Sequence, residues 1–244
     1  MISLQHPAVV PFEPQGIEEG KRWTSELGIR FIHAPMLPWV SDNTEALATI
    51  RQAAAAGSGR FYVHCGLGRD RVNVVKHMLE SMGATTGGAE VAKAMAWEDR
   101  EAAGLGAMEN GQHRSIAPEV WLVPLPNEHE LFGNMLAGQA GRVVLLLDPS
   151  DGEQGPAITE MIRLFDVYGV DYVERPLRAG DRAEARRIAE AVKAGTRPVT
   201  VVAPRLPPRG RTEVADLFLA EWTAAIEIPA AARAGDTDRA VGSR

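Results

Sequence analysis

The residues best suited to covalent chemistry lie in one short stretch, residues 63–71 (VHCGLGRDR), which contains the only cysteine of this 244-residue chain. An apolar run precedes the stretch, and a run with helical spacing, residues 72–82, follows it. Proteins build anion-binding cradles from a strand, a glycine-bearing loop and a helix, because the loop N–H groups and the helix dipole point at one place. The sequence therefore predicts an anion site beside a cysteine.

The residue types in this loop predict a nucleophile and a phosphate clamp together. The helix dipole and the flanking arginines favour the thiolate form of Cys65, which is the form that attacks electrophiles. Arg71, six residues further on, can hold two oxygens of the same anion with its planar guanidinium group. Gly66 and Gly68 let the backbone wrap an anion without Cβ clashes.

Composition and charge exclude several classes of protein. The net charge of −6 argues against a nucleic-acid or anionic-membrane surface, since such binding depends on clustered cations. A single cysteine excludes an intramolecular disulfide framework and suits a reducing compartment. The N-terminus, Met1-Ile2-Ser3-Leu4, does not resemble a signal peptide, and no apolar run approaches the roughly 20 residues of a membrane span. We therefore expect a cytoplasmic protein that binds neither nucleic acid nor membrane.

Strand-like and helix-like segments alternate along the chain, which predicts an α/β fold with a mostly parallel sheet flanked by helices and sites at the carboxyl ends of its strands. Asp42 with Glu45, and Asn127 with Glu130, have the spacing of a helix capping box. The expected strands cover residues 2–4, 29–34, 61–64, 121–123, 143–147, 170–173 and 199–202, and the expected helices cover 14–27, 42–56, 72–82, 89–103, 127–138, 156–169, 181–194 and 212–226.

An internal repeat divides the chain. Residues 2–7 align with 144–149, 28–36 with 169–177, and 61–65 with 200–204, at an offset of about 140 residues. Where the first copy has its cysteine loop, the second has residues 204–211 (PRLPPRGR), without a nucleophile and with added prolines that remove backbone donors.

The repeat predicts a phosphate-site domain at residues 1–105, a linker at 106–117, a second copy at 118–228 that has lost its chemistry, and a disordered tail at 229–244. The segment before the second copy's first repeated strand, residues 118–142, has no counterpart before Met1. The first copy is therefore expected to be truncated at its N-terminus, unless this segment serves both halves.

Residues 64–71 (HCGLGRDR) resemble the His-Cys-x-x-Gly-x-x-Arg signature loop of cysteine-dependent protein tyrosine and dual-specificity phosphatases. The wider run 28–82 is also similar to that superfamily, with a Gly-Ile-x-Phe-x-x-x-Pro strand ending, a capped helix and a strand ending in Val-His-Cys. The resemblance implies two tandem phosphatase-like three-layer units, of which only the first carries an active-type loop.

The resemblance also implies a mechanism without metal or cofactor. The Cys65 thiolate attacks phosphorus, and water hydrolyses the cysteinyl-phosphate. His64 braces the loop, and the substrate is a phosphorylated protein or a small phosphate ester. The implied catalytic residues are Cys65, Arg71, Asp70 and His64, and the implied phosphate-binding residues are Gly66, Leu67, Gly68, Arg69 and Arg71.

The sequence departs from the family pattern at two positions. Val72 stands where the family usually has Ser or Thr, whose hydroxyl eases departure of the thiolate. The family's upstream acid has no match at its usual spacing, which points nearer Pro38 than Asp42. Two carboxylates remain as candidate acids: Asp70, as in family members with Lys-Asp-Arg or Trp-Asp-Arg loops, and Asp42, whose alternative role is a helix N-cap.

Three functions follow from these patterns. The first is a phosphatase acting on phosphotyrosine-like or other phosphate monoesters. The second is a pseudophosphatase that binds phosphorylated partners without turnover, as Val72 and the missing upstream acid suggest. The third is a rhodanese-type sulfurtransferase, which also places a cysteine loop before a helix, although that family usually carries its cysteine in the C-terminal half.

Overall fold

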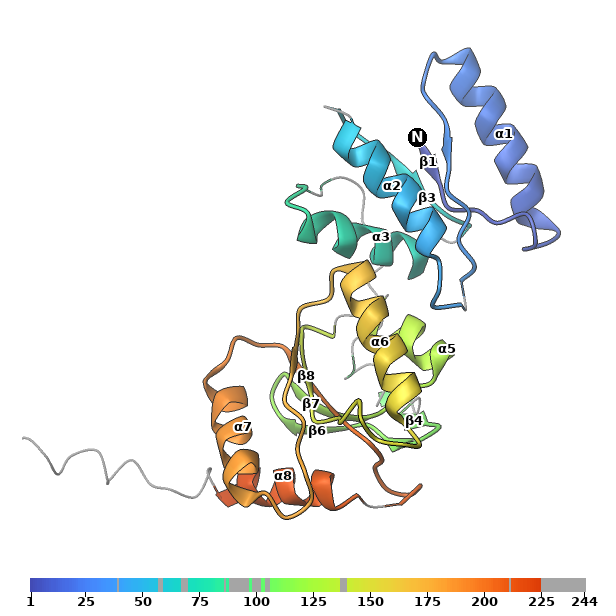
Figure 1. Cartoon of the computed structure of the whole chain (residues 1–244). Helices are drawn as coiled ribbons and strands as arrows, with labels where there is room; N and C mark the ends of the chain where they lie inside the picture. The colour runs from blue at the N-terminus through green and yellow to red at the C-terminus, as the bar shows by residue number, and fades with distance from the viewer. Residues whose placement is uncertain are drawn as a thin grey trace, which may run out of the picture.

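The computed structural model describes residues 1–38, 40–56, 59–66, 70–85, 87, 97, 102–103, 106–136, 140–210 and 212–224. These residues form an α/β fold with a smaller sheet near the N-terminus and a larger one in the second half (Figure 1). The expected helix 89–103 lies almost wholly outside the described residues, and the expected tail 229–244 lies entirely outside them.

The first sheet is parallel and carries the cysteine loop. Its strands are β1 (Ile2–Ser3), β2 (Ile32–His33) and β3 (Val63–His64), in the order β2-β1-β3. The helices that alternate with them are α1 (Phe12–Glu26), α2 (Thr44–Ala56) and α3 (Asp70–Ser81). Figure 1 shows α1 on one side of this sheet and α2 with α3 on the other.

The second sheet has the order β6-β7-β10-β8-β9, and β6 is its only antiparallel strand among the described residues. Successive side chains of its central strands alternate between two core clusters: Val202 contacts the cluster that contains α6, and Val201 the cluster that contains α7 and α8. The elements are β6 (Arg114–Ala117), β7 (Val120–Pro124), β8 (Arg142–Leu145), β9 (Tyr172–Glu174), β10 (Val199–Ala203), α6 (Gly155–Tyr168), α7 (Arg182–Ala194) and α8 (Glu213–Ala224).

Helix ends lie where the sequence predicts them when the capping residue bonds groups within a few residues of itself. The capping box at Asn127 is present: its side chain accepts from the Glu130 N–H, and the Glu130 carboxylate accepts from the Asn127 N–H. It opens the short α5 (Glu128–Glu130), which continues as the π-helix η1 (Leu131–Leu136). Asp181 caps α7, and Gly169 ends α6 with a left-handed φ of 70°.

Two local expectations are wrong. Asp42 and Glu45 form no capping box; the Asp42 carboxylate accepts instead from the backbone N–H of Thr44, the first residue of α2. The segment 106–117, for which a weak pattern predicts a linker, forms β4 (Ala107–Met108), β5 (Gly111–Gln112) and β6. Strand β6 pairs with β7 through backbone hydrogen bonds, which need no alternation of apolar side chains.

The two sheets share a local strand order, since β2-β1-β3 and β9-β8-β10 are related element by element along the chain. Ile2 lies opposite Ile32, and Val144 lies opposite Val173, which are equivalent pairs in the aligned repeat. The pairing of the third strands is shifted by one residue. Ile2 lies opposite Val63, which the repeat aligns with Val202, but Val144 lies opposite Val201.

A single buried cluster joins the two halves of the molecule. It contains residues of β1, α2 and α3 together with residues of α6 and β8. Figure 1 shows α6 lying between the second sheet and the pair α2 and α3. No helix in the described part of the chain is both long enough and apolar enough to cross a bilayer.

Candidate functional site

Cys65 lies directly after β3, at the carboxyl end of the first sheet. Its residue surface is only 8% exposed, and α3 begins five residues later at Asp70. Three of the predicted phosphate-binding residues, Leu67, Gly68 and Arg69, lie outside the described residues. The strand before the loop, β3, and the helix after it, α3, are therefore both present as the sequence predicts.

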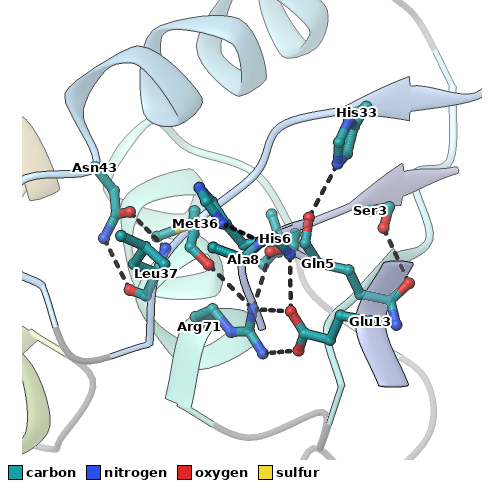
Figure 2. A network of polar contacts seen from close by, with 11 residues as sticks. Ser3, Gln5, His6, Ala8, Glu13, His33, Met36, Leu37, Asn43 and Arg71 are labelled. Atoms are coloured by element: carbon teal, nitrogen blue, oxygen red, sulfur yellow. Dashed lines mark hydrogen bonds and ion pairs between the residues drawn. The ribbon is translucent and has the colours of Figure 1, made fainter. Parts of the chain in front are cut away.

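Arg71, in the first turn of α3, is buried beneath the ends of the strands (Figure 2). Its Nη1 donates to the carbonyl oxygens of Leu4, at 3.1 Å, and Met36, at 3.0 Å, which follow β1 and β2. Its guanidinium group also lies within hydrogen-bonding reach of the Cys65 side chain. Arg71 thus ties α3 to the carboxyl ends of the sheet and places its charge beside the sulfur.

The guanidinium group of Arg71 also holds Glu13, a residue of the first turn of α1 (Figure 2). Arg71 Nη1 donates to Glu13 Oε2 at 3.0 Å, and Nη2 donates to Oε1. The pairing is bidentate, which is the geometry that Arg favours with carboxylates. Glu13 and Arg71 are 4% and 5% exposed, so this ion pair is buried.

Backbone donors complete the surroundings of the Glu13 carboxylate. The N–H of His6 donates to Oε2 at 2.7 Å, and the N–H of Gly66 also hydrogen-bonds the carboxylate. Burial alone would raise the pKa of Glu13, but the bonds from Arg71, His6 and Gly66 outweigh it and hold this pKa below its ordinary value. Burial likewise opposes the charge of Arg71, whereas Glu13 and Cys65 raise its pKa above the usual value.

Gly66 lies against the Glu13 carboxylate. A Cβ atom placed there would lie 2.5 Å from Glu13 Oε1 and 3.5 Å from Arg71 Nη2. A larger residue at this position would therefore push the Glu13 carboxylate from its present place. In this structure the anion beside the Gly66 backbone is the Glu13 carboxylate.

His64 and Asp70 flank the loop. His64 is half-buried, its ring stacks on Tyr62 with centroids 5.8 Å apart, and its Nε2 has no hydrogen-bond partner among the described residues. Burial and the nearby N-terminal ammonium group lower the pKa of His64, so the imidazole is neutral at pH 7. Asp70 is the first residue of α3, next to Arg71.

Asp42 is engaged in structural contacts. Its carboxylate accepts from the N–H of Thr44 at 3.1 Å and from the Thr44 hydroxyl, and it lies 3.3 Å from Arg163 Nη2 of α6. These contacts, led by the Thr44 hydroxyl, lower the pKa of Asp42. A carboxyl that stays ionised is a poor proton donor, so the structure favours the helix-start role over acid duty for Asp42.

Val72 and residues 204–210, the described part of the loop that the sequence aligns with the cysteine loop, both lack the groups that the phosphatase pattern has. Val72 is 8% exposed and belongs to the core cluster, so its side chain packs where a hydroxyl would need a partner. In the loop 204–210, Arg205 pairs with Glu153 at 2.6 Å, at an exposed position. Among the described residues of that loop, none is a nucleophile.

A cavity of about 390 Å³ lies at the other end of α3, between that helix, η1 and the end of α6. Its lining includes His77, Leu136 and Tyr168 and none of the described residues around Cys65. The candidate chemistry and this cavity are therefore separate features of the fold.

Sequence reasoning identified Cys65 and Arg71 but missed Glu13. Its 58-residue separation from Arg71 leaves no spacing signal, and an acid in the first turn of a helix is common for dipole reasons alone. No protein-family model matches the chain, and searches of curated proteins and of solved structures find no match.

Proposed function

We propose that this protein is a cysteine-dependent phosphatase that hydrolyses phosphate monoesters, of the phosphotyrosine or dual-specificity type, through a cysteinyl-phosphate intermediate. The observation that carries the proposal is the arrangement at the end of β3. There Cys65 lies beside the Gly66 N–H and the guanidinium fork of Arg71, and these two groups of donors already bind the Glu13 carboxylate. A nucleophile beside donors that hold an oxyanion is the minimum equipment for phosphoryl transfer.

In this mechanism the Cys65 thiolate attacks phosphorus in line, forming an S–P bond as the ester P–O bond breaks. Arg71 and the loop N–H groups stabilise the equatorial oxygens as charge develops on them. The leaving alkoxide or phenoxide takes a proton from an acid. Water then attacks the phosphorus of the cysteinyl-phosphate, releasing inorganic phosphate and the thiolate.

Asp70 is the stronger candidate for the acid. It begins α3 beside Arg71, close in sequence to the nucleophile. The contacts of Asp42, led by the Thr44 hydroxyl, lower the pKa of Asp42 and disfavour it as a proton donor. Protonated Asp70 would donate to the leaving oxygen in the first step, and its carboxylate would take a proton from water in the second. His64, neutral and adjacent to the nucleophile, acts on the conformation of the loop rather than on the proton balance.

We further propose that residues 1–105 and 118–228 are tandem phosphatase-like units, the second one degenerate. The shared order of β2-β1-β3 and β9-β8-β10 supports this reading. The helices α2, α3 and α6 that meet between them give the second unit a supporting role in holding the first.

The test is hydrolysis of p-nitrophenyl phosphate by the wild type and by Cys65→Ser. We expect turnover by the wild type and a loss of at least about a thousandfold in kcat for the serine variant, because a hydroxyl has far less anion character at neutral pH than a thiol. Inorganic phosphate should inhibit the wild type competitively. Equal rates for the two proteins would rule out Cys65 as nucleophile.

A second candidate function is a pseudophosphatase that binds phosphorylated partners without turning them over. The buried Val72 and the occupied Arg71 fork favour it. Phosphate binding without Cys65-dependent hydrolysis would support this function over the first. Transfer of sulfur from thiosulfate to cyanide would instead identify the sulfurtransferase alternative.

A further inference from the structure

Glu13 occupies donors that the proposed reaction needs for its substrate. The Arg71 fork and the Gly66 N–H, both expected to bind the transferring phosphoryl group, donate to the Glu13 carboxylate. A carboxylate presents two oxygens to these donors much as a phosphoryl group would present two of its three. The Glu13 side chain of α1 thus forms the contacts expected of the substrate's phosphoryl group.

The two anions exclude each other. Glu13, Arg71 and Cys65 are all less than 10% exposed, so no second oxyanion fits on the same fork without movement. A doubly charged phosphate placed beside an ionised, buried carboxylate would also meet strong repulsion at low local dielectric. Binding of a phosphate ester therefore requires the Glu13 carboxylate to leave the Arg71 fork.

The segment that carries Glu13 has few buried side chains to anchor it. It follows a turn at residues 7–11, and α1 begins without a side-chain cap at Pro11. Its neighbours Val10 and Phe12 are 71% and 82% exposed, so they do not anchor it, whereas Ile17, one turn further on, is buried. The hydrogen bonds that tie the first turn of α1 to preceding residues are the Glu13 N–H bond to the Val9 carbonyl oxygen and the His6 N–H bond to the Glu13 carboxylate, and the Gln5 side chain packs against Gly16.

We propose that Glu13 is an intramolecular competitor of the phosphate group, which occupies the Cys65 loop in the resting chain and is displaced when an oxyanion binds. This inference rests on the proposed function, because it assigns phosphate to the same donors. The fraction of molecules in which Glu13 has left Arg71 then sets the apparent affinity for phosphate. The measured Kd equals the Kd of these open molecules divided by their fraction.

The first test is calorimetric titration of the full chain with inorganic phosphate, comparing the wild type with Glu13→Gln. The amide keeps the size of the side chain but removes the charge, so we expect phosphate to bind about tenfold more tightly or better. Glu18→Gln is the matched control, because Glu18 lies on the same helix, is exposed and pairs only locally with Lys21. Its phosphate affinity should equal that of the wild type.

A second measurement uses the wild type and needs no variant. When Glu13 leaves, the His6 N–H loses its 2.7 Å acceptor, so phosphate should accelerate amide hydrogen exchange in residues 5–15. A purely structural Glu13–Arg71 pair would leave this exchange unchanged, or slow it as the ligand orders the loop. Unchanged or slower exchange at saturating phosphate would overturn the competitor role even if Glu13→Gln fails to fold.

The outcomes separate this inference from the proposed function. If no form hydrolyses p-nitrophenyl phosphate but Glu13→Gln binds phosphate more tightly, catalysis is wrong and competition stands. If the wild type hydrolyses the ester through Cys65 while Glu13→Gln binds phosphate equally or more weakly, competition is wrong and the function stands. Absence of phosphate binding in every form would overturn both.

Discussion

At the scale of single residues, the central feature is the ion pair of Arg71 and Glu13, which is buried next to Cys65. Removing two charges from water is costly, and their attraction offsets that cost only when the remaining donors and acceptors are satisfied. Here Arg71 meets two carbonyl oxygens as well as the carboxylate, and Glu13 meets two backbone N–H groups. The pair is well satisfied, which explains how it persists in a nearly dry setting.

The lowered pKa of Glu13 makes the stability of the fold depend on pH. A carboxyl whose folded pKa lies below its unfolded value stabilises the fold fully above that value, 4.5 here, and the stabilisation is lost as the pH falls through the folded pKa. We expect the free energy of unfolding of the wild type to exceed that of Glu13→Gln by a constant amount above about pH 5. The difference should shrink below it.

Urea unfolding of both proteins between pH 7 and pH 3 measures this difference. Glu18→Gln serves as the control, because Glu18 is exposed, and its curve should run parallel to that of the wild type. A difference between the wild type and Glu13→Gln that stays constant down to pH 3 would mean that the ion pair contributes nothing to the pH dependence.

Residue types and spacing predict the site only as far as it is local in sequence. Cys65 and Arg71 are separated by one loop, so their proximity follows from the strand–loop–helix pattern. Glu13 comes from another element, and its place depends on the angle at which α1 packs on the sheet. Asp42 shows that even a local contact can be predicted wrongly. Its carboxylate accepts from the N–H of Thr44, two residues on, and not from that of Glu45, three residues on, and residue types alone do not distinguish the two.

At the scale of elements, glycine at a helix end shows how local and tertiary constraints combine. Gly169 ends α6 with a φ of 70°, and a Cβ there would lie 2.2 Å from Ser81 Oγ of α3. Gly180 has a similar φ of 79°, but a Cβ there would meet no atom within 4 Å. Comparing alanine substitutions at the two glycines therefore distinguishes the cost of backbone strain from the cost of a collision with a neighbouring helix.

We therefore expect Gly180→Ala to destabilise the protein by about 1 kcal/mol, the ordinary cost of a left-handed alanine. Gly169→Ala should cost roughly 1–3 kcal/mol more, because the new methyl group also forces α3 and α6 apart. Thermal and urea unfolding give both values. Adding Ser81→Gly to Gly169→Ala removes the colliding side chain and should bring its cost toward that of Gly180→Ala; no recovery would disprove the collision.

Elements differ in how far their own sequence determines them. Asn127 with Glu130, Asp181 and Gly169 mark helix ends through bonds within a few residues, and these ends are where the sequence predicts them. β2 and β3 are only two residues long, shorter than their apolar runs, because a strand ends where its neighbour β1 ends. β6 has no apolar alternation and exists through pairing with β7.

At the scale of the whole molecule, the two halves are joined by hydrogen bonds as well as by the shared buried cluster. The Tyr168 hydroxyl of α6 donates to the carbonyl oxygen of Ser41 at 2.5 Å, and Ser41 Oγ donates to the carbonyl oxygen of Glu128. Burial is the main cause that raises the pKa of Tyr168 to about 12, so it remains a neutral donor. The loop before α2 is thereby fixed to the second half.

Tyr168→Phe should therefore weaken both halves together. The Ser41 carbonyl oxygen, in a buried residue, would keep the Asn43 N–H at 3.2 Å but lose the Tyr168 hydroxyl, which costs about 1 kcal/mol. We expect one unfolding transition at a lower denaturant midpoint, and faster hydrogen exchange in both α2 and α6. Tyr172→Phe is the control, because its hydroxyl donates to Asp166 at an exposed position; its cost should stay within about 0.5 kcal/mol.

The pattern of hydrogen exchange decides what this contact does. If the halves form one cooperative unit, the protection lost in α2 equals that lost in α6, because both report the same global opening. If exchange rises in α6 alone, the contact stabilises only the helix that carries it. Loss of protection in both helices would mean that residues of α6 hold the loop before α2 and so stabilise the half of the molecule that contains Cys65.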